Sequence, residues 1–202
     1  MWPVLVLDNI THLVLYRLYV RHPLEDIQEL ISKCLINDRG GQEKLYRKFY
    51  PALYFLCKKF FRDENDALEA LNDGMLKVFK NIGQYNEEKG AFFNWVYTIV
   101  RNAACDKLKK DNTHTFTSSD TTDLVIAGAD NPLSDLEWKD IYQLLQVLPP
   151  GTRAVCVLYY LEGFSVSEIC GQLQLSAGTV KWHLSETRLK MKPVLLKYHS
   201  KK

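Results

Sequence analysis

The spacing of apolar residues most strongly limits what this chain can fold into. Along most of the sequence these residues recur at intervals of three and four, and the alternation typical of β-strands is nearly absent. This spacing gathers apolar side chains on one face of a helix, and that face must pack against other helices to leave water. The pattern lapses over residues 111–136, where Ser, Thr and Asp are frequent and Lys and Arg are absent. We therefore predict an all-α protein with two small helical domains joined by a flexible acidic linker.

The first helical block opens with two predicted helices. An apolar stripe from Leu24 to Leu35 stops at residues 37–41, which are Asn, Asp, Arg and two Gly, and a second helix is predicted to follow at once. A second stripe then runs from Leu45 to Phe60. This stripe contains Pro51, which lacks a backbone N–H and therefore predicts a kink or a break in the helix.

Two further helices complete this block. The third is predicted to begin at a cap within residues 63–66, and the fourth to span 91–110 after a polar loop at 83–90. The spacing predicts a buried stripe on each helix, which leaves the other faces for partners. These stripes are Leu68, Leu71, Met75, Phe79 and Ile82 on the third helix, and Phe92, Val96, Ile99 and Ala103 on the fourth.

The second block has the spacing of several short helices. One is predicted from about residue 136 to Leu148, where the run Pro-Pro-Gly at 149–151 ends it, and residues 152–161 form another. Ser165 and Glu168 then have the S-x-x-E spacing of a capping box, in which each side chain accepts a hydrogen bond from the other residue's backbone at a helix start.

Two short amphipathic patterns follow this capping box with almost nothing between them. Ser176 is suited to cap the second helix, and five apolar residues are predicted to pin the two helices together. This is the spacing of a helix-turn-helix, whose second helix enters the major groove of DNA. A packed helical hairpin with a solvated basic tail is the alternative. The pinning residues are Ile169, Leu173, Leu175, Val180 and Leu184.

Charge is segregated along the chain, although the formal net charge is only +2. Residues 111–136 carry five acidic residues and no basic ones, whereas from Lys181 onward seven basic residues accompany a single acid, Glu186. A local cationic run of this kind attracts polyanions such as nucleic acid, and a solvated tail would give the same count.

Other features argue against several classes of protein. No apolar run reaches the ~20 residues of a spanning helix, so no membrane insertion is expected. The five cysteines form no CxxC pair and no histidine lies at ligand spacing, so neither a metal site nor a disulfide framework is predicted, and a reducing cytoplasm fits best.

No nucleotide-binding or catalytic motif occurs, so neither a cofactor nor enzymatic activity is expected. Residues 1–23 form an uncertain N-terminal extension.

Three segments resemble bacterial sigma factors of the extracytoplasmic-function (ECF) group. LPPGTRAVCVLYYLEG and FSVSEICGQLQLSAGTVKWHLSETRLKMK, residues 148–192, resemble the promoter-recognition domain of that family. DALEALNDGMLKVFKNIGQY, residues 66–85, is similar to its core-polymerase-binding helix, and FFNWVYTIVRNAACDKLKK, residues 92–110, to its promoter-melting helix. The resemblance implies a region 2-like domain at 24–110, a linker at 111–136 and a region 4-like helix-turn-helix domain at 137–202.

The same resemblance implies the partners. They are core RNA polymerase, promoter double-stranded DNA and the non-template single strand, and an anti-sigma factor is a further candidate. The second helix of the helix-turn-helix turns polar, aromatic and basic residues outward, toward base edges and phosphates. The resemblance implies that they read a −35 element. The candidates are Ser176, Thr179, Lys181, Trp182, His183, Ser185, Glu186 and Arg188.

The fourth helix places an amide, an aromatic ring and a cation opposite its buried stripe, with a second ring flanking them, where a displaced single strand could stack. The resemblance implies that the preceding loop captures a flipped base of the −10 element. The candidates for −10 recognition and melting are Tyr85, Asn86 and Lys89 in the loop, and Phe93, Asn94, Tyr97 and Arg101 on the helix.

The third helix has a mixed polar face that suits a docking surface, although a merely solvated face would look the same. The resemblance implies that the clamp helices of core RNA polymerase dock there. The candidate contacts are Asp66, Glu69, Asn72, Asp73, Met75 and Lys77.

These features predict a non-enzymatic sigma factor that binds core RNA polymerase and directs promoter-specific transcription initiation. The helix-turn-helix also resembles the DNA-binding domain of LuxR-type activators, so a stand-alone regulator is the alternative. Such activators usually carry a sensor or receiver domain, and residues 24–110 show neither an α/β pattern nor a phosphoacceptor pocket.

Overall fold

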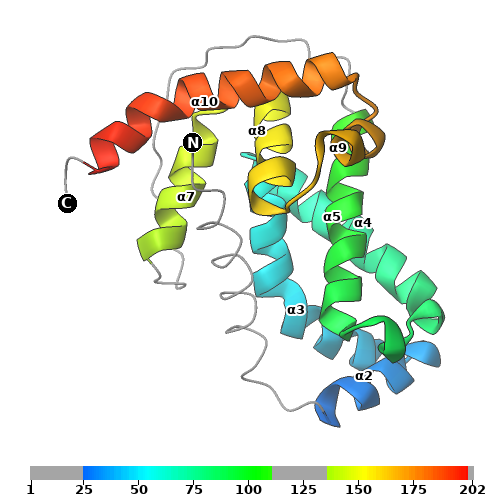
Figure 1. Ribbon diagram of the computed structural model, residues 1–202. Helices are drawn as coiled ribbons and strands as arrows, with labels where there is room; N and C mark the ends of the chain where they lie inside the picture. The colour runs from blue at the N-terminus through cyan, green and yellow to red at the C-terminus, as the bar shows by residue number, and fades with distance from the viewer. Residues whose placement is uncertain (1–24, 111–135, 200–202) are drawn as a thin grey trace. The chain divides into compact units, whose positions relative to one another are not determined.

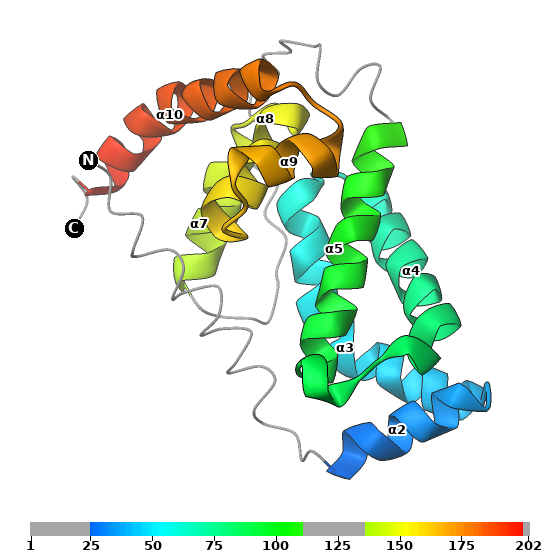
Figure 2. The ribbon, with the colours of Figure 1, turned by 45° about the vertical axis from the view of Figure 1, so that its right-hand side comes forward.

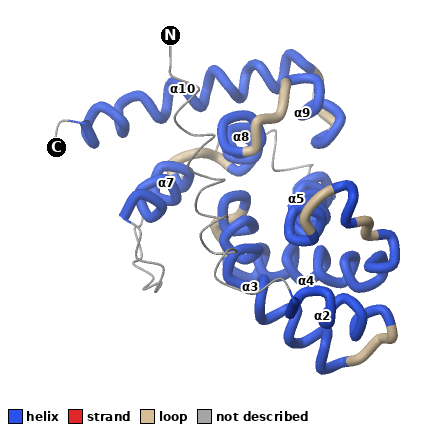
Figure 3. Tube along the Cα trace, turned by 60° about the horizontal axis from the view of Figure 1, so that its bottom comes forward, coloured by secondary structure: helices blue, strands red, loops and turns tan. Residues whose placement is uncertain are grey.

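The computed structural model describes residues 25–110 and 136–199 (Figure 1). Every regular element in these two ranges is a helix or a helical turn, which confirms the predicted all-α fold (Figure 3). The chain divides into two compact units between Lys107 and Leu108. The predicted N-terminal extension and all but the last residue of the predicted linker lie outside the described residues. None of the described helices is long and apolar enough to span a lipid bilayer.

The elements of the first unit precede those of the second along the chain. The first unit contains α2 (Glu25–Leu35), α3 (Arg39–Phe60), α4 (Glu64–Asn81), the 3-10 turns η2 (Ile82–Gln84) and η3 (Glu87–Lys89), and most of α5 (Phe92–Lys110). The second unit contains α7 (Leu136–Gln146), α8 (Pro150–Cys156), the π-helical turn η4 (Val157–Leu161), α9 (Val166–Leu173) and α10 (Ala177–His199).

Helix α3 includes Gly40 and Gly41, so it begins within the run at which the first apolar pattern stops. Asp38 caps the helix, and its Oδ1 accepts a hydrogen bond from the backbone N of Gly41 at 2.6 Å. A Cβ atom on Gly41 would lie 2.5 Å from the Cβ of Lys33, so glycine is what allows α2 and α3 to approach here. The predicted break at Pro51 is absent, because α3 continues past this exposed residue.

Helix α5 lies alongside α3 and α4 in both ribbon views (Figures 1 and 2). Phe49 of α3 contacts Phe92 and Phe93 of α5, with ring centroids 6.0 and 5.3 Å apart. The predicted stripe on α5 is therefore too narrow, and Ile99, which it included, is only half-buried. The buried residues of α5 in this unit include Phe92, Phe93, Val96, Tyr97, Val100, Ala103, Ala104 and Cys105.

Helix α4 begins as predicted, because Asp63 Oδ1 accepts hydrogen bonds from the backbone N of Asn65 at 2.8 Å and of Asp66 at 3.1 Å. In its middle, a Cβ atom on Gly74 would lie 2.8 Å from the Cα of Val100, so α4 and α5 pack almost backbone to backbone. This close approach selects small residues and rotates the buried face away from the predicted one. Leu68 and Phe79 are half-buried, while the helix buries Ala67, Ala70, Leu71, Gly74, Met75 and Val78.

The helix boundaries in the second unit differ from the predicted ones. Pro150 and Gly151 begin α8 rather than only ending the helix before it, and proline suits a first helical turn because it needs no N–H partner. The predicted helix at 152–161 changes to a π-helical turn at Val157. There the backbone N of Glu162 donates to the carbonyl oxygen of Val157 at 3.0 Å, which widens the turn by one residue.

Helices α9 and α10 form the predicted helix-turn-helix. The capping box is confirmed, since the Ser165 N donates to Glu168 Oε2 at 2.8 Å and the Glu168 N donates to Ser165 Oγ at 3.3 Å. Gln174 turns the chain with a φ of 56°, a left-handed conformation uncommon for residues other than glycine. Of the predicted pinning residues, Leu175 is half-buried and the others are fully buried: Ile169, Leu173, Val180 and Leu184.

Candidate DNA-binding and protein-binding surfaces

The outer face of α10 carries a row of exposed side chains. Trp182 is 54% exposed, with Lys181 and Ser185 beside it within one turn. The exposed Leu189, which was not among the predicted residues, continues the row, and an apolar group there could contact a thymine methyl. This face combines the groups that meet base edges and phosphates in a major groove. Of the predicted residues, Thr179 and Glu186 are half-exposed, and those exposed are Ser176, Lys181, Trp182, Ser185 and Arg188.

The N-terminus of α10 is organised by two hydroxyls. The Oγ atom of Ser176 lies 2.8 Å from Oγ1 of Thr179 and accepts a hydrogen bond from the Thr179 backbone N at 3.1 Å. One turn beyond the tryptophan, Glu186 pairs with Lys190 at 3.3 Å, which offsets the repulsion between this carboxylate and DNA phosphates.

His183 is buried, so the prediction that it faces DNA is wrong. It is 2% exposed, and its Nδ1 lies 3.0 Å from the Oγ1 of Thr152 in α8. Burial lowers the pKa of its imidazole, and the negative charge of Glu186 raises it by less, so the pKa is lowered overall. The sequence did hold a signal for this burial, because position 183 is three residues after Val180 and four before Thr187, both of which are buried.

We expect the second unit to lose stability as the pH falls below the ordinary range of histidine. The pKa of His183 is lower in the folded protein than the 6.5 of a free histidine, so the unfolded chain takes up the proton first. The stability that the neutral imidazole gives to the folded unit is therefore fully present above the unfolded pKa of 6.5. It is lost as the pH falls through the folded pKa. Thermal unfolding from about pH 7.5 to about pH 5.5 should show a falling midpoint.

The variant His183→Asn is the control for this dependence. Asparagine keeps a polar group near Thr152 without titrating in this range. Its unfolding midpoint should vary less with pH than that of the natural protein. An equally steep decline in the variant would show that other groups cause the pH dependence.

The loop between α4 and α5 is held by its own side chains. Tyr85 packs its ring edge-to-face on Phe92 of α5, with centroids 4.9 Å apart, and donates its hydroxyl proton to the Gly90 carbonyl oxygen at 3.0 Å. Asn86 caps the turn η3 through its side-chain oxygen. Of the three predicted loop residues, Tyr85 and Asn86 therefore shape the loop, while Lys89 is exposed.

Phe93 and Tyr97 are buried, so the prediction that these rings face a single strand is wrong. Their centroids lie 6.0 Å apart, and the buried Nζ of Lys59 in α3 donates to the Tyr97 hydroxyl at 3.4 Å. Helix α3 thus covers the side of α5 that the sequence pattern left open. Of the predicted residues on this helix, Asn94 is exposed and Arg101 is half-exposed.

The outer face of α4 has an apolar centre. Met75 is 2% exposed, so its predicted contact with polymerase is wrong, whereas its place in the buried stripe is confirmed. The next residue, Leu76, is 51% exposed and was missed, although it lies three residues after Asp73 and four after Asn72. The Oδ1 of Asn72 accepts a hydrogen bond from the Tyr46 hydroxyl at 2.8 Å. The exposed residues of this face, called the α4 row below, are Glu69, Asn72, Asp73, Leu76, Lys77 and Lys80.

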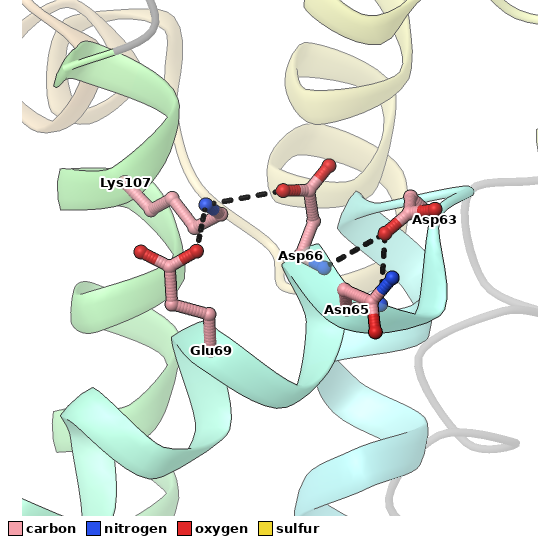
Figure 4. Close-up of polar contacts among 5 residues, drawn as sticks. All are labelled: Asp63, Asn65, Asp66, Glu69 and Lys107. Atoms are coloured by element: carbon pink, nitrogen blue, oxygen red, sulfur yellow. Dashed lines mark hydrogen bonds and ion pairs between the residues drawn. The ribbon is translucent and has the colours of Figure 1, made fainter.

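Acidic residues of α4 are paired with α5 (Figure 4). The Nζ of Lys107 lies 2.6 Å from a carboxylate oxygen of Glu69 and 3.1 Å from one of Asp66. Burial alone would lower the pKa of the Lys107 ammonium, but the hydrogen bonds and charges of these two carboxylates raise it, so the group stays charged. A second ion pair between these helices has the opposite polarity, because Lys77 of α4 lies 2.7 Å from a carboxylate oxygen of Asp106 in α5.

These surfaces define a helix-turn-helix protein with a second helical unit. Residues 45–113 match the family model for sigma-70 region 2, and residues 138–191 match that for sigma-70 region 4. Together the two matches cover more than half of the chain. The chain therefore belongs to the sigma-70 family of transcription initiation factors, and within it to the ECF type.

Several members of this type are similar over most of their length. The chain is 27% identical over 175 residues to the ECF RNA polymerase sigma factor SigM of Mycobacterium tuberculosis (strain ATCC 25618 / H37Rv), with 87% of each chain covered. It is 23% identical over 174 residues to the ECF RNA polymerase sigma factor SigW of Bacillus subtilis (strain 168), covering 80% of this chain and 92% of SigW. Among solved structures, the sigma factor RpoE in complex with the anti-sigma factor NepR from Bartonella quintana is similar with a TM-score of 0.46 and 19% identity, covering 76% of this chain and 95% of RpoE.

Proposed function

We propose that this chain binds core RNA polymerase and directs it to specific promoters, without catalysing a reaction and without a cofactor. The observation that carries the proposal is the occurrence of region 2 and region 4 matches in one chain, in that order. The proposed domains are residues 24–110 and 137–202, with 111–136 as a flexible linker. The protein would act in the cytoplasm, where the polymerase transcribes.

The second domain is proposed to read a −35 element with α10 in the major groove. Lys181, Trp182 and Ser185 form the centre of the exposed face and would meet base edges. Arg188 lies further along the helix, where a phosphate contact is expected. His183 would support this helix from inside, through its contact with Thr152.

The first domain is proposed to open the −10 region with the loop at 84–90 and with α5. Lys89, Asn94 and Arg101 are the groups that would touch the displaced strand, while Tyr85 and Asn86 would shape the loop that captures a base. Unstacking costs a few kcal/mol per step, and one stacked base returns about 1–3 kcal/mol. This chain alone would not hold a bubble of several bases, so core polymerase must supply the remaining contacts.

The α4 row is proposed to dock on core polymerase. An exposed leucine surrounded by polar and charged groups has the composition of an interface anchor with a polar rim. Family resemblance supports an anti-sigma factor as a further partner. The similarities found give no support to the LuxR-type alternative.

Mapping transcript starts tests this function. Core RNA polymerase is incubated with the purified chain and genomic DNA of the source organism, and the 5′ ends of the RNA are sequenced. We expect starts that share an upstream sequence and that vanish when the chain is omitted. A chain that fails to associate with core, or that stimulates transcription only when another sigma factor is present, would contradict the proposal.

A further inference from the structure

Arg188 of α10 is held by a residue that lies outside the helix-turn-helix. Its Nε donates a hydrogen bond to the hydroxyl oxygen of Tyr160 at 3.2 Å. Tyr160 belongs to the π-helical turn η4, where its ring packs edge-to-face on Tyr159 with centroids 4.9 Å apart. Tyr160 is half-buried and Arg188 is exposed. The ring of Tyr160 is therefore held by its neighbours, and its hydroxyl in turn fixes the orientation of the exposed Arg188 side chain.

This contact leaves the charged end of Arg188 open. A guanidinium carries five N–H donors, and the Nε–H is the one that Tyr160 takes. Among the described residues, no ion pair or second hydrogen bond engages the two terminal nitrogens of Arg188. These nitrogens form the planar fork that matches two oxygens of a phosphate.

The position of Arg188 along α10 suits a contact with the DNA backbone. At ~1.5 Å per residue, it lies about 18 Å along the helix axis from Ser176. A recognition helix reads bases mainly near its N-terminal end, and flanking residues contact phosphates that fix its register. Arg188 also lies three residues after the exposed Ser185, so both lie on the side of α10 that carries the exposed row.

We propose that Tyr160 is a positioning residue for promoter binding, which holds the guanidinium of Arg188 in the orientation that clamps a DNA phosphate beside the −35 element. The inference rests on the proposed function of α10 and assigns a part in it to a side chain outside that helix. A free arginine loses rotamer freedom when it binds phosphate, and a side chain already oriented by Tyr160 loses less. Removing the tyrosine hydroxyl should therefore weaken binding about two- to tenfold, as expected for one hydrogen bond.

A double-mutant cycle tests this role. Holoenzyme assembled from the full chain and core polymerase is titrated onto a labelled duplex that carries the upstream element of a promoter identified by 5′-end mapping. The variants are Tyr160→Phe, Arg188→Ala and their combination, with Tyr159→Phe as the matched control that removes a neighbouring hydroxyl. Titrations at several salt concentrations give the slope of log affinity against log salt.

We expect Tyr160→Phe to weaken binding about two- to tenfold and Tyr159→Phe to leave it unchanged. Arg188→Ala should weaken binding further and lower the salt slope by about one, as for the loss of one phosphate contact. In the Arg188→Ala background, Tyr160→Phe should have no added effect, because nothing remains to be positioned.

Three results would overturn the proposal. Tyr160→Phe could bind like the natural protein, or it could weaken binding equally with and without Arg188, which would indicate a structural role or a direct DNA contact of its own. Arg188→Ala could also leave the salt slope unchanged, so that no phosphate is clamped. Failure of the proposed function is distinct, since the natural holoenzyme would then fail to select a promoter at all.

Discussion

Replacing Leu76 with aspartate is expected to weaken binding to core RNA polymerase by at least about thirtyfold, the loss typical of an interface anchor. Leu76 is 51% exposed at the centre of the α4 row, so its side chain is available to a partner and contributes little to the core. Aspartate would place an unpaired carboxylate in the docked interface, beside Asp73. Titration of the fluorescently labelled chain with core polymerase would measure the change in dissociation constant.

Ile36→Asp is the matched control for this substitution. Ile36 belongs to the same unit, is 78% exposed, lies in the turn between α2 and α3, and is not part of the α4 row. It should bind core polymerase as the natural chain does. If Leu76→Asp also bound normally, α4 would not be the docking surface. Equal weakening by both variants would point instead to a general effect of added negative charge.

Replacing Gly74 with valine is expected to unfold the first unit, or to leave it only marginally stable. The new Cβ would lie 2.8 Å from the Cα of Val100 and 2.9 Å from its Cγ2, so α4 and α5 would have to move apart. Overpacking of a core commonly costs about 1–3 kcal/mol, and the cost is higher where the obstacle is backbone. Domains of this size have about 5–15 kcal/mol of stability, so the loss is a large share. Urea unfolding followed by circular dichroism would measure it.

Two alanine variants separate this clash from helix propensity. Gly74→Ala gains about 1 kcal/mol of helix propensity but meets the same obstacle at Val100, so a net loss of stability is expected. Gly171→Ala lies in α9, where a Cβ would meet nothing within 4 Å, and should stabilise its unit by about 0.5–1 kcal/mol. If Gly74→Ala were as stabilising as Gly171→Ala, the close approach of α4 and α5 would be contradicted.

The local features of this fold could be predicted because each depends on neighbouring residues. The cap at Asp63 and the capping box of Ser165 and Glu168 are set by side chains that reach only two or three residues along the chain. The helix-turn-helix followed from the same short-range spacing. The start of α3 at Arg39 was not predicted, because Gly40 and Gly41 add nothing to an apolar stripe and the close approach of Lys33 to Gly41 cannot be read from composition.

Which side chains are buried and which are exposed was harder to predict, because this depends on how many other helices pack against a helix. One apolar stripe describes a helix with one neighbour, whereas α5 packs against both α3 and α4 and so buries Phe93 and Tyr97 as well. His183 was assigned by its chemistry rather than by its position, which lies within the buried spacing of α10. Leu76 was missed because the candidates on the docking face were chosen as polar groups and one thioether, and an exposed leucine is neither.

The ion pairs made by α4 also bear on how fast this chain can find its polymerase. Lys107 lies within a few ångströms of two carboxylates, those of Asp66 and Glu69, and Lys77 offsets Asp106, so only one net negative charge remains among these five groups. Opposite charges this close cancel beyond a Debye length, so they exert little long-range pull on an approaching protein. Recruitment through this face would then be governed by collision frequency and shape, and its rate would depend only weakly on ionic strength.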